Sequence, residues 1–237
     1  MAHYYAIACK ALKPEIEFCL TKQPSQNSLT VDWMQQGLHN TPEELRTQLQ
    51  KKLDTVPDAD AVLLAYGLCG GALRGLHCRR TLVIPRAHDC ISLLFGSRET
   101  HEQYVREYPG SYFFSAGWLR EAPVPSAQND RRRLEEYTAL YGPDNADYLL
   151  QTETAWRKKY KQAVYISWNL PDSPQDRRMV QDCAAYLGWN YTEIQGSPDW
   201  LCRLLNGPWN PEDFLVLNPN QPVPEDLSGL CLRETQP

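Results

Sequence analysis

The chain has 237 residues, 42% of them hydrophobic and 22% charged, with a formal net charge of −5. That length suffices for one large domain or two small lobes, and the negative balance argues against broad nucleic-acid binding, which clustered Lys and Arg drive. No run approaches the roughly 20 apolar residues of a membrane span, and no secretory signal opens the chain. We therefore expect a cytoplasmic protein with neither nucleic-acid nor membrane partners, whose eight cysteines are thiols or metal ligands rather than disulfides.

The N-terminal half alternates apolar runs typical of strands with segments typical of helices. The run at residues 61–66 is apolar throughout, as in a strand covered on both faces. Strands are predicted at residues 4–9, 29–33, 61–66, 81–84 and 112–114. Helices are predicted at residues 14–22, 42–53, 91–96 and 99–107.

The next stretch, residues 129–161, is expected to form one or two helices with a break near Gly142 and Pro143. Its aromatic residues have a spacing more typical of a core or a lobe interface than of a ligand platform. They are Tyr137, Tyr141, Tyr148, Trp156 and Tyr160. Beyond it, strands are predicted at residues 163–167, 189–194 and 213–217, and helices at 175–187 and 198–205.

This alternation predicts an α/β fold in which mostly parallel strands are flanked by helices, in one sheet or in two βαβ-type lobes. We expect an N-terminal α/β lobe that carries the functional site over residues 1–128. A helical connector over residues 129–161 would join it to a C-terminal α/β lobe over residues 162–237.

Cysteine and histidine residues follow three of the predicted strands. Cys9 ends the first strand, Cys69 follows the strand at 61–66, and both His88 and Cys90 follow the strand at 81–84. Sites in parallel α/β sheets form at the carboxyl ends of strands, where the loops meet. Thiolate and imidazole groups from three elements are what a zinc or iron–sulfur site needs. We therefore expect Cys9, Cys69, His88 and Cys90 to bind a metal.

The segment His88-Asp89-Cys90 allows two local readings. If it is extended, residues two apart point the same way and both reach one metal. If Cys90 begins a helix, the positive end of that helix would lower the pKa of its thiol. Asp89 would orient His88, act in acid–base catalysis, or cap the helix.

The loop Tyr66-Gly67-Leu68-Cys69-Gly70-Gly71 follows a buried strand, and its glycines permit positive φ angles and the close approach of a ligand. It matches neither a P-loop nor a dinucleotide fingerprint. We expect Gly67, Gly70 and Gly71 to contact a bound cofactor or small molecule.

Two arginines, Arg86 and Arg98, flank the His-Asp-Cys segment. Their guanidinium groups suit the capture of a carboxylate or phosphate, with Arg86 in a catalytic role and Arg98 in binding, and structural ion pairs are the competing reading. The remaining cysteines are expected to be structural, with Cys78 as a reserve ligand. Those structural cysteines are Cys19, Cys183, Cys202 and Cys231.

The motifs Tyr-Gly-Leu-Cys69-Gly, Pro-Arg-Ala-His88-Asp-Cys90-Ile and Pro-Gly-Ser-Tyr112-Phe-Phe-Ser-Ala-Gly-Trp118 resemble those of a bacterial and archaeal family catalogued as a domain of unknown function. Genes of that family often lie near those of corrinoid-dependent methyltransferases, so the resemblance implies a corrinoid protein or a methyltransferase as partner. The chain lacks the Asp-x-His-x-x-Gly pattern of corrinoid carriers. Its His-x-Cys pair is similar to that of zinc-dependent methyl acceptors.

The leading hypothesis is a protein that binds zinc or an iron–sulfur cluster, acts in methyl-transfer metabolism and takes a small-molecule ligand. One alternative is a non-catalytic accessory protein that binds a partner through the aromatic segment 112–118 and has structural cysteines. A second alternative is a thiol-redox protein in which Cys69 and Cys90 form a reversible disulfide. The sequence leaves open whether the chain is an enzyme.

Overall fold

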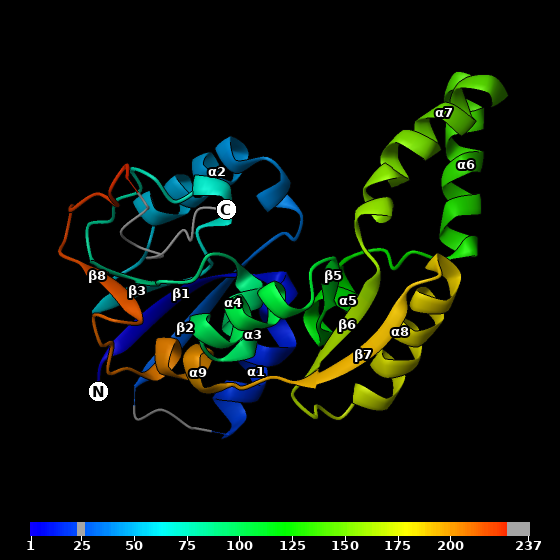
Figure 1. Ribbon diagram of the computed structural model, residues 1–237. Helices are drawn as coiled ribbons and strands as arrows, with labels where there is room; N and C mark the ends of the chain where they lie inside the picture. Colours follow the sequence, from blue (N-terminus) through cyan, green and yellow to red (C-terminus); the bar gives the residue numbers. More distant parts are fainter. Residues whose placement is uncertain (23–26, 227–237) are drawn as a thin grey trace. The chain divides into compact units, whose positions relative to one another are not determined.

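A computed structural model describes residues 1–22 and 27–226, so the predicted structural Cys231 lies outside the described residues. The chain divides into two compact units (Figure 1). Unit 1 comprises Met1–Glu102 and Gly196–Pro237, and unit 2 comprises Gln103–Gln195. Each unit has its own sheet with flanking helices, which confirms the α/β prediction. The two units divide the chain after Glu102 and after Gln195. The predicted lobe boundaries near residues 128 and 161 stay a prediction.

Unit 1 contains a five-stranded sheet in the order β2-β1-β3-β4-β8. The first four strands run parallel, and β8 pairs antiparallel with β4 at the edge. All five residues of β3 are buried, as its unbroken apolar run predicts. The strands are β1 (His3–Cys9), β2 (Ser28–Met34), β3 (Ala61–Ala65), β4 (Thr81–Pro85) and β8 (Phe214–Leu217).

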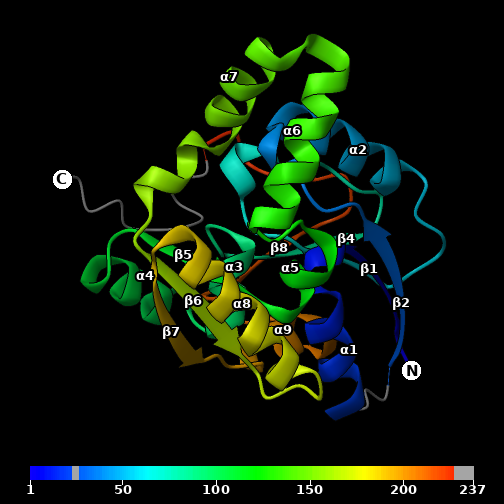
Figure 2. The same cartoon turned by 90° about the vertical axis from the view of Figure 1, so that its right-hand side faces the viewer.

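Helices cover both faces of this sheet (Figure 2). Helix α2 turns Leu45, Leu49 and Leu53 toward one face, because residues four apart share one side of a helix. Helices α1 and α9 lie together on the other face. The helices that lie wholly in unit 1 are α1 (Lys13–Lys22), α2 (Pro42–Asp54), α3 (Cys90–Phe95) and α9 (Asp199–Asn206), and α4 (Arg98–Glu107) begins there. Short 3-10 turns are η1 (Lys10–Leu12), η2 (Leu38–Asn40) and η3 (Cys69–Gly71).

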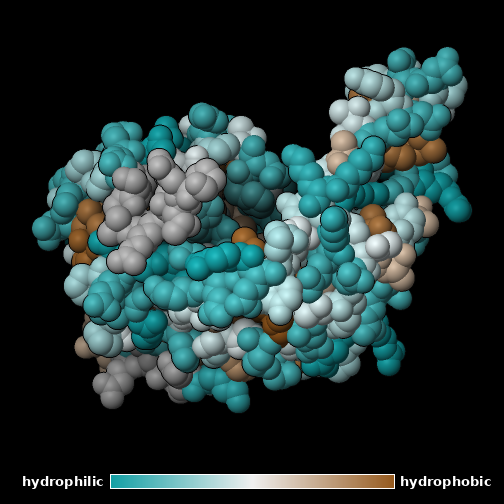
Figure 3. All heavy atoms as spheres, in the orientation of Figure 1, coloured by the Kyte–Doolittle hydropathy of each residue, from teal (hydrophilic) through white to brown (hydrophobic). Residues whose placement is uncertain are grey.

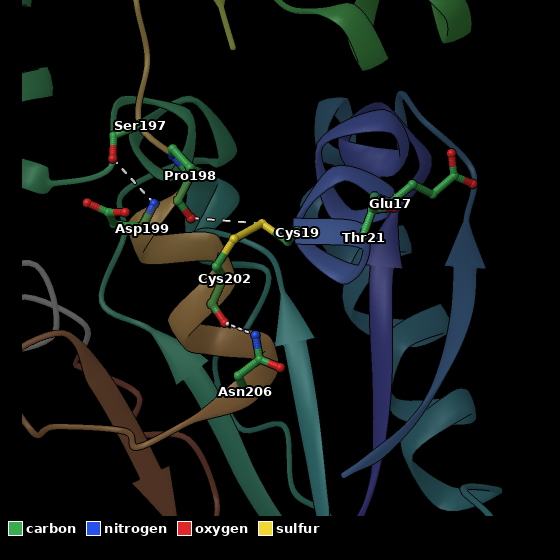
Figure 4. Close-up of a disulfide and its surroundings, with 8 residues drawn as sticks. All are labelled: Glu17, Cys19, Thr21, Ser197, Pro198, Asp199, Cys202 and Asn206. Atoms are coloured by element: carbon green, nitrogen blue, oxygen red, sulfur yellow. Dashed lines mark hydrogen bonds between the residues drawn. A yellow bond between two sulfur atoms is a disulfide. The ribbon is translucent and has the colours of Figure 1, made fainter. Parts of the chain in front are cut away.

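A disulfide joins α1 to α9 within unit 1. Cys19 and Cys202 are 183 residues apart in sequence, yet their Cα atoms lie 5.2 Å apart (Figure 4). The prediction that the cysteines are thiols or ligands rather than disulfides is therefore wrong for this pair. The packing of α9 against α1 is a long-range feature of the fold, and cysteine spacing alone does not reveal it. Of the helices in the described ranges, none combines the length and apolar character that crossing a bilayer requires.

Unit 2 contains a parallel three-stranded sheet in the order β5-β6-β7, with helix α8 packed against β6 and β7. Phe114 and Tyr165 are buried in its core with Val180 and Cys183 of α8. The strands are β5 (Ser111–Phe114), β6 (Gln162–Ser167) and β7 (Asn190–Gln195). The helices are α5 (Ala116–Glu121), α6 (Ala127–Tyr141), α7 (Pro143–Thr154) and α8 (Ser173–Leu187), and the 3-10 turn η4 spans Ala155–Lys159.

Helices α6 and α7 form an antiparallel hairpin that projects from the sheet of unit 2 (Figure 1). Its turn lies at Gly142, where φ is +81°, and Pro143 begins α7, so the predicted break is confirmed. The aromatic residues here are expected in a core or a lobe interface, and the core placement is wrong for Tyr141 and Tyr148. Tyr141 and Tyr148 are 55% and 69% exposed. Hydrophilic residues cover most of the surface that Figure 3 shows.

Candidate functional site

Three thiols gather around Tyr66 at the carboxyl ends of β1, β3 and β4. Cys9 ends β1, Tyr66 and Cys69 follow β3, and Cys90 follows β4. The Tyr66 side chain is buried, and burial together with the nearby sulfurs of Cys9, Cys90 and Cys69 raises its pKa. Parallel strands end at the same edge of a sheet, so residues far apart in sequence meet here.

The two loops that carry Cys69 and Cys90 are joined along their backbones. The amide of Leu68 donates to the carbonyl of Ala87 (2.9 Å), and the amide of Cys69 donates to the carbonyl of His88 (3.2 Å). A β-carbon at Gly67 would come within 2.6 Å of the Asp89 amide nitrogen, so only glycine fits between the loops. The hydrogen bonds between the two loops fix the spacing of Cys69 and Cys90.

Cys69 has a backbone conformation that L-residues seldom adopt. Its φ is +44°, and the left-handed turn continues through Gly70 (φ +66°) and Gly71 (φ +86°). The carbonyl of Gly71 accepts a hydrogen bond from Arg46 Nη2 at 3.0 Å. A non-glycine residue at positive φ stores strain of order 1–3 kcal/mol, which often marks a functional position. The glycines predicted to contact a ligand shape the turn that presents Cys69.

Cys90 begins helix α3, as one of the two readings of its segment predicted. The neighbouring Cys69 side chain and burial together raise the pKa of Cys90 well above its ordinary value. The expected lowering of this pKa by the helix end is therefore wrong. A thiol with a raised pKa keeps its proton near neutral pH.

Asp89 caps helix α3, which confirms one of its predicted roles. Its Oδ1 accepts from the amide of Ser92 (3.0 Å) and from the Ser92 hydroxyl (3.1 Å), and that hydroxyl lies 2.9 Å from Nδ1 of His101. The Asp89 Oδ2 lies 3.5 Å from Nδ1 of His88. Burial would raise the pKa of Asp89, but His88, His101 and the Ser92 amide outweigh it and lower the pKa to about 2.

The two predicted arginines have other partners. Arg86 Nε donates to the carbonyl of Pro211 at 2.8 Å. Arg98 forms salt bridges with Glu99 (3.0 Å) and Glu102 (4.0 Å). The contacts of Arg98 are structural ion pairs, whereas Arg86 contacts a backbone carbonyl, and the predicted catalytic and binding roles of both side chains stay predictions.

No group of three or more His, Cys, Asp and Glu side chains within residues 1–22 and 27–226 is arranged to hold a metal ion. The prediction of a metal-binding protein is therefore wrong. The physical reason is that the His88 imidazole is exposed beside Asp89 and does not complete a metal-binding group with the three thiols. The side chain of His88 is 77% exposed beside Asp89, Cys9 lies buried beside Tyr66, and Cys90 is engaged with Cys69.

The sequence reasoning missed the network behind Asp89. Ser92 is fully buried and His101 is 8% exposed, and together they hold the capping carboxylate in place. An Asp followed three residues later by Ser at a helix start is a recognisable capping pattern, so Ser92 carried a usable signal. His101 had no such signal in the sequence, because its burial depends on how α4 packs near α3.

The match to known sequences covers both loops of the site. Residues 33–205, well over half of the chain, match the family described as "Protein of unknown function (DUF1638)". The matched range contains Cys69, His88 and Cys90, whereas Cys9 and Cys19 precede it. No curated protein and no solved structure matches the chain significantly. The resemblance to an uncharacterised family is thus confirmed at the level of the family itself: the chain belongs to the DUF1638 family.

Proposed function

We propose that the chain is a thiol-redox protein in which Cys69 and Cys90 form a reversible disulfide. The observation that carries this proposal is the nearness of the two side chains, which raises the pKa of Cys90, across two loops that are themselves joined by backbone hydrogen bonds. Both residues are half-buried and free, whereas Cys9, Cys78 and Cys183 are buried. Dithiol–disulfide chemistry needs at least two neighbouring thiols that a reactant can reach.

The two sulfurs have different roles in this proposal. Cys90 holds its proton because its pKa is raised. Cys69 is therefore the attacking sulfur, and its strained turn places it at the carboxyl-terminal edge of the unit 1 sheet. Cys90 is the resolving thiol, which reacts second.

The co-reactant is a disulfide R–S–S–R. The Cys69 thiolate attacks one sulfur, the R–S–S–R bond breaks, and one RS⁻ departs as a mixed disulfide forms on Cys69. Cys90 then attacks the Cys69 sulfur, the mixed-disulfide bond breaks, and the second RS⁻ departs while the Cys90 proton passes to a departing thiolate. The chain loses two electrons as its dithiol becomes a disulfide, and R–S–S–R gains them as two thiols.

The direct test is oxidation of the full chain with glutathione disulfide, followed by thiol counting and peptide mapping. We expect the loss of two thiols, a cross-linked pair of peptides containing Cys69 and Cys90, and the disappearance of that cross-link with dithiothreitol. Cys69→Ser and Cys90→Ser should each abolish the cross-link. Cys183→Ser is the matched control, because Cys183 is a buried free cysteine of unit 2, and it should leave the cross-link unchanged.

A different outcome would favour structural cysteines. If the Cys69–Cys90 cross-link does not form while Cys69→Ser and Cys90→Ser only lower the stability, the thiol-redox proposal fails. A corrinoid protein or a methyltransferase as the physiological partner stays a prediction, which a pull-down with wild-type and Cys69→Ser protein would test.

A further inference from the structure

Unit 2 contains an open cleft of about 500 Å³ at the amino ends of β6 and β7. One wall comes from the end of η4 and the residues that lead into β6, and the other from the loop between α8 and β7. The side chains that decide its chemistry are Arg157, Lys158, Tyr160, Lys161 and Trp189. The volume lies within the range of small-molecule sites, which is roughly 300–1,000 Å³.

The cleft is positively charged although the chain has a net charge of −5. Of the described residues that line it, three are cations and none is Asp or Glu. Arg157 is held by Asp130, to which its guanidinium donates two hydrogen bonds. Within the described ranges, Lys158 and Lys161 have no salt-bridge partner, so their charges remain available to a ligand. Such a local positive potential attracts anions.

The rings in the cleft are held in place from behind. Tyr160 and Trp189 have ring centroids 5.8 Å apart, and each also packs against Tyr112, at 5.0 and 5.9 Å. Trp156 stacks on Tyr112 at 5.0 Å and also lies near Tyr160 (5.8 Å) and Trp189 (6.2 Å). A ring that is fixed before binding loses little conformational freedom when a ligand packs against it.

We propose that this cleft binds a nucleotide-class ligand, a planar heteroaromatic base joined to a phosphate. The base packs against Trp189 and Tyr160, since aromatic stacking suits any planar ring. The phosphate lies at Lys158 and Lys161, because lysine acts as a compact point charge toward phosphate. This site is separate from the cysteine pair and does not depend on the thiol chemistry.

The test is calorimetric titration of the full chain with AMP, adenosine and inorganic phosphate. We expect AMP to bind at least about ten times more tightly than either half alone, because ring and phosphate are held together. Lys158→Gln and Lys161→Gln should each weaken AMP binding by about five-fold, and binding should weaken further with salt. Lys159→Gln is the matched control. It removes the same charge from an exposed neighbour that does not line the cleft, so AMP affinity should be unchanged.

Four outcomes would overturn the proposal. AMP that fails to bind at millimolar concentration excludes the ligand class. Adenosine that binds as tightly as AMP shows that the lysines are not used. Equal losses in Lys158→Gln and Lys159→Gln indicate only a diffuse charge effect. A single-stranded oligonucleotide that binds far more tightly than AMP would replace the proposal with a nucleic-acid surface.

Discussion

Gly67 and Asp89 touch through their backbones, and this contact sets the distance between the two cysteine loops. A β-carbon on residue 67 would lie 2.6 Å from the Asp89 nitrogen, well inside the closest approach of real atoms. Because the neighbouring atoms belong to the backbone of a helix cap, they cannot move aside cheaply. The contact between Cys69 and Cys90 therefore depends on a residue with no side chain.

Gly67→Ala should separate the loops and slow the formation of the Cys69–Cys90 cross-link. The added methyl group overpacks the contact, and we expect the free energy of unfolding to fall by about 1–3 kcal/mol. Gly188→Ala is the control, because residue 188 has a positive φ (+67°) but nothing within 4 Å of a β-carbon. It should cost about 1–2 kcal/mol through its backbone alone and leave the cross-linking rate unchanged. Equal cross-linking rates in both variants would refute the role of Gly67.

Asp89→Asn should remove a pH-dependent part of the stability. The pKa of Asp89 in the folded chain, about 2, lies below its ordinary value of 3.8. The unfolded chain then binds more protons, so the charge stabilises the fold above about pH 4 and this contribution is lost as the pH falls toward 2. Because the side chain is 38% exposed, solvent screening limits the contribution to about 1 kcal/mol.

Asparagine keeps an oxygen for the Ser92 amide, so this substitution tests the charge rather than the cap. The free energy of unfolding, measured by denaturant titration, should be lower in Asp89→Asn than in wild type at pH 5.5. The difference should shrink at pH 2.5. A difference that is the same at both values would mean that the carboxylate charge contributes nothing.

The elements of this chain could be predicted because their signals are local. The apolar run of β3 and the Gly142–Pro143 break can each be recognised from a few consecutive residues. The meeting of Cys69 and Cys90 followed from one topological rule about strand ends. That rule did not predict the chemistry of the site, because the chemistry depends on the orientation of each side chain. His88 is exposed beside Asp89, and no spacing rule distinguishes that from a ligand that faces inward.

The features that escaped prediction are long-range. Cys19 and Cys202 pair only because the chain, after passing through all of unit 2, re-enters unit 1 and forms α9 there. The antiparallel pairing of β8 with β4 depends on the same return. Neither leaves a periodic or compositional trace in the sequence.

Removal of the disulfide should destabilise unit 1. The bond closes a loop of 183 residues, and in the chain-entropy account such a cross-link contributes about 2–5 kcal/mol by restricting the unfolded state. The Cys19→Ala/Cys202→Ala double variant should therefore unfold at a lower denaturant concentration than wild type. Dithiothreitol should lower the wild-type midpoint toward that of the double variant and leave the variant itself unaffected. A midpoint shared by oxidised wild type and the double variant would contradict this role.

Substitutions at the tip of the α6–α7 hairpin should have almost no effect on stability. Leu140 and Tyr148 are 71% and 69% exposed, so Leu140→Ser and Tyr148→Ser remove little buried surface. We expect the free energy of unfolding to change by no more than about 0.5 kcal/mol in each. Phe114→Ala is the contrast, because Phe114 is fully buried in the core of unit 2, and its loss should cost about 3–5 kcal/mol. If the tip variants cost as much as Phe114→Ala, the tip is covered in solution, and sedimentation of the wild-type chain would then reveal a larger assembly.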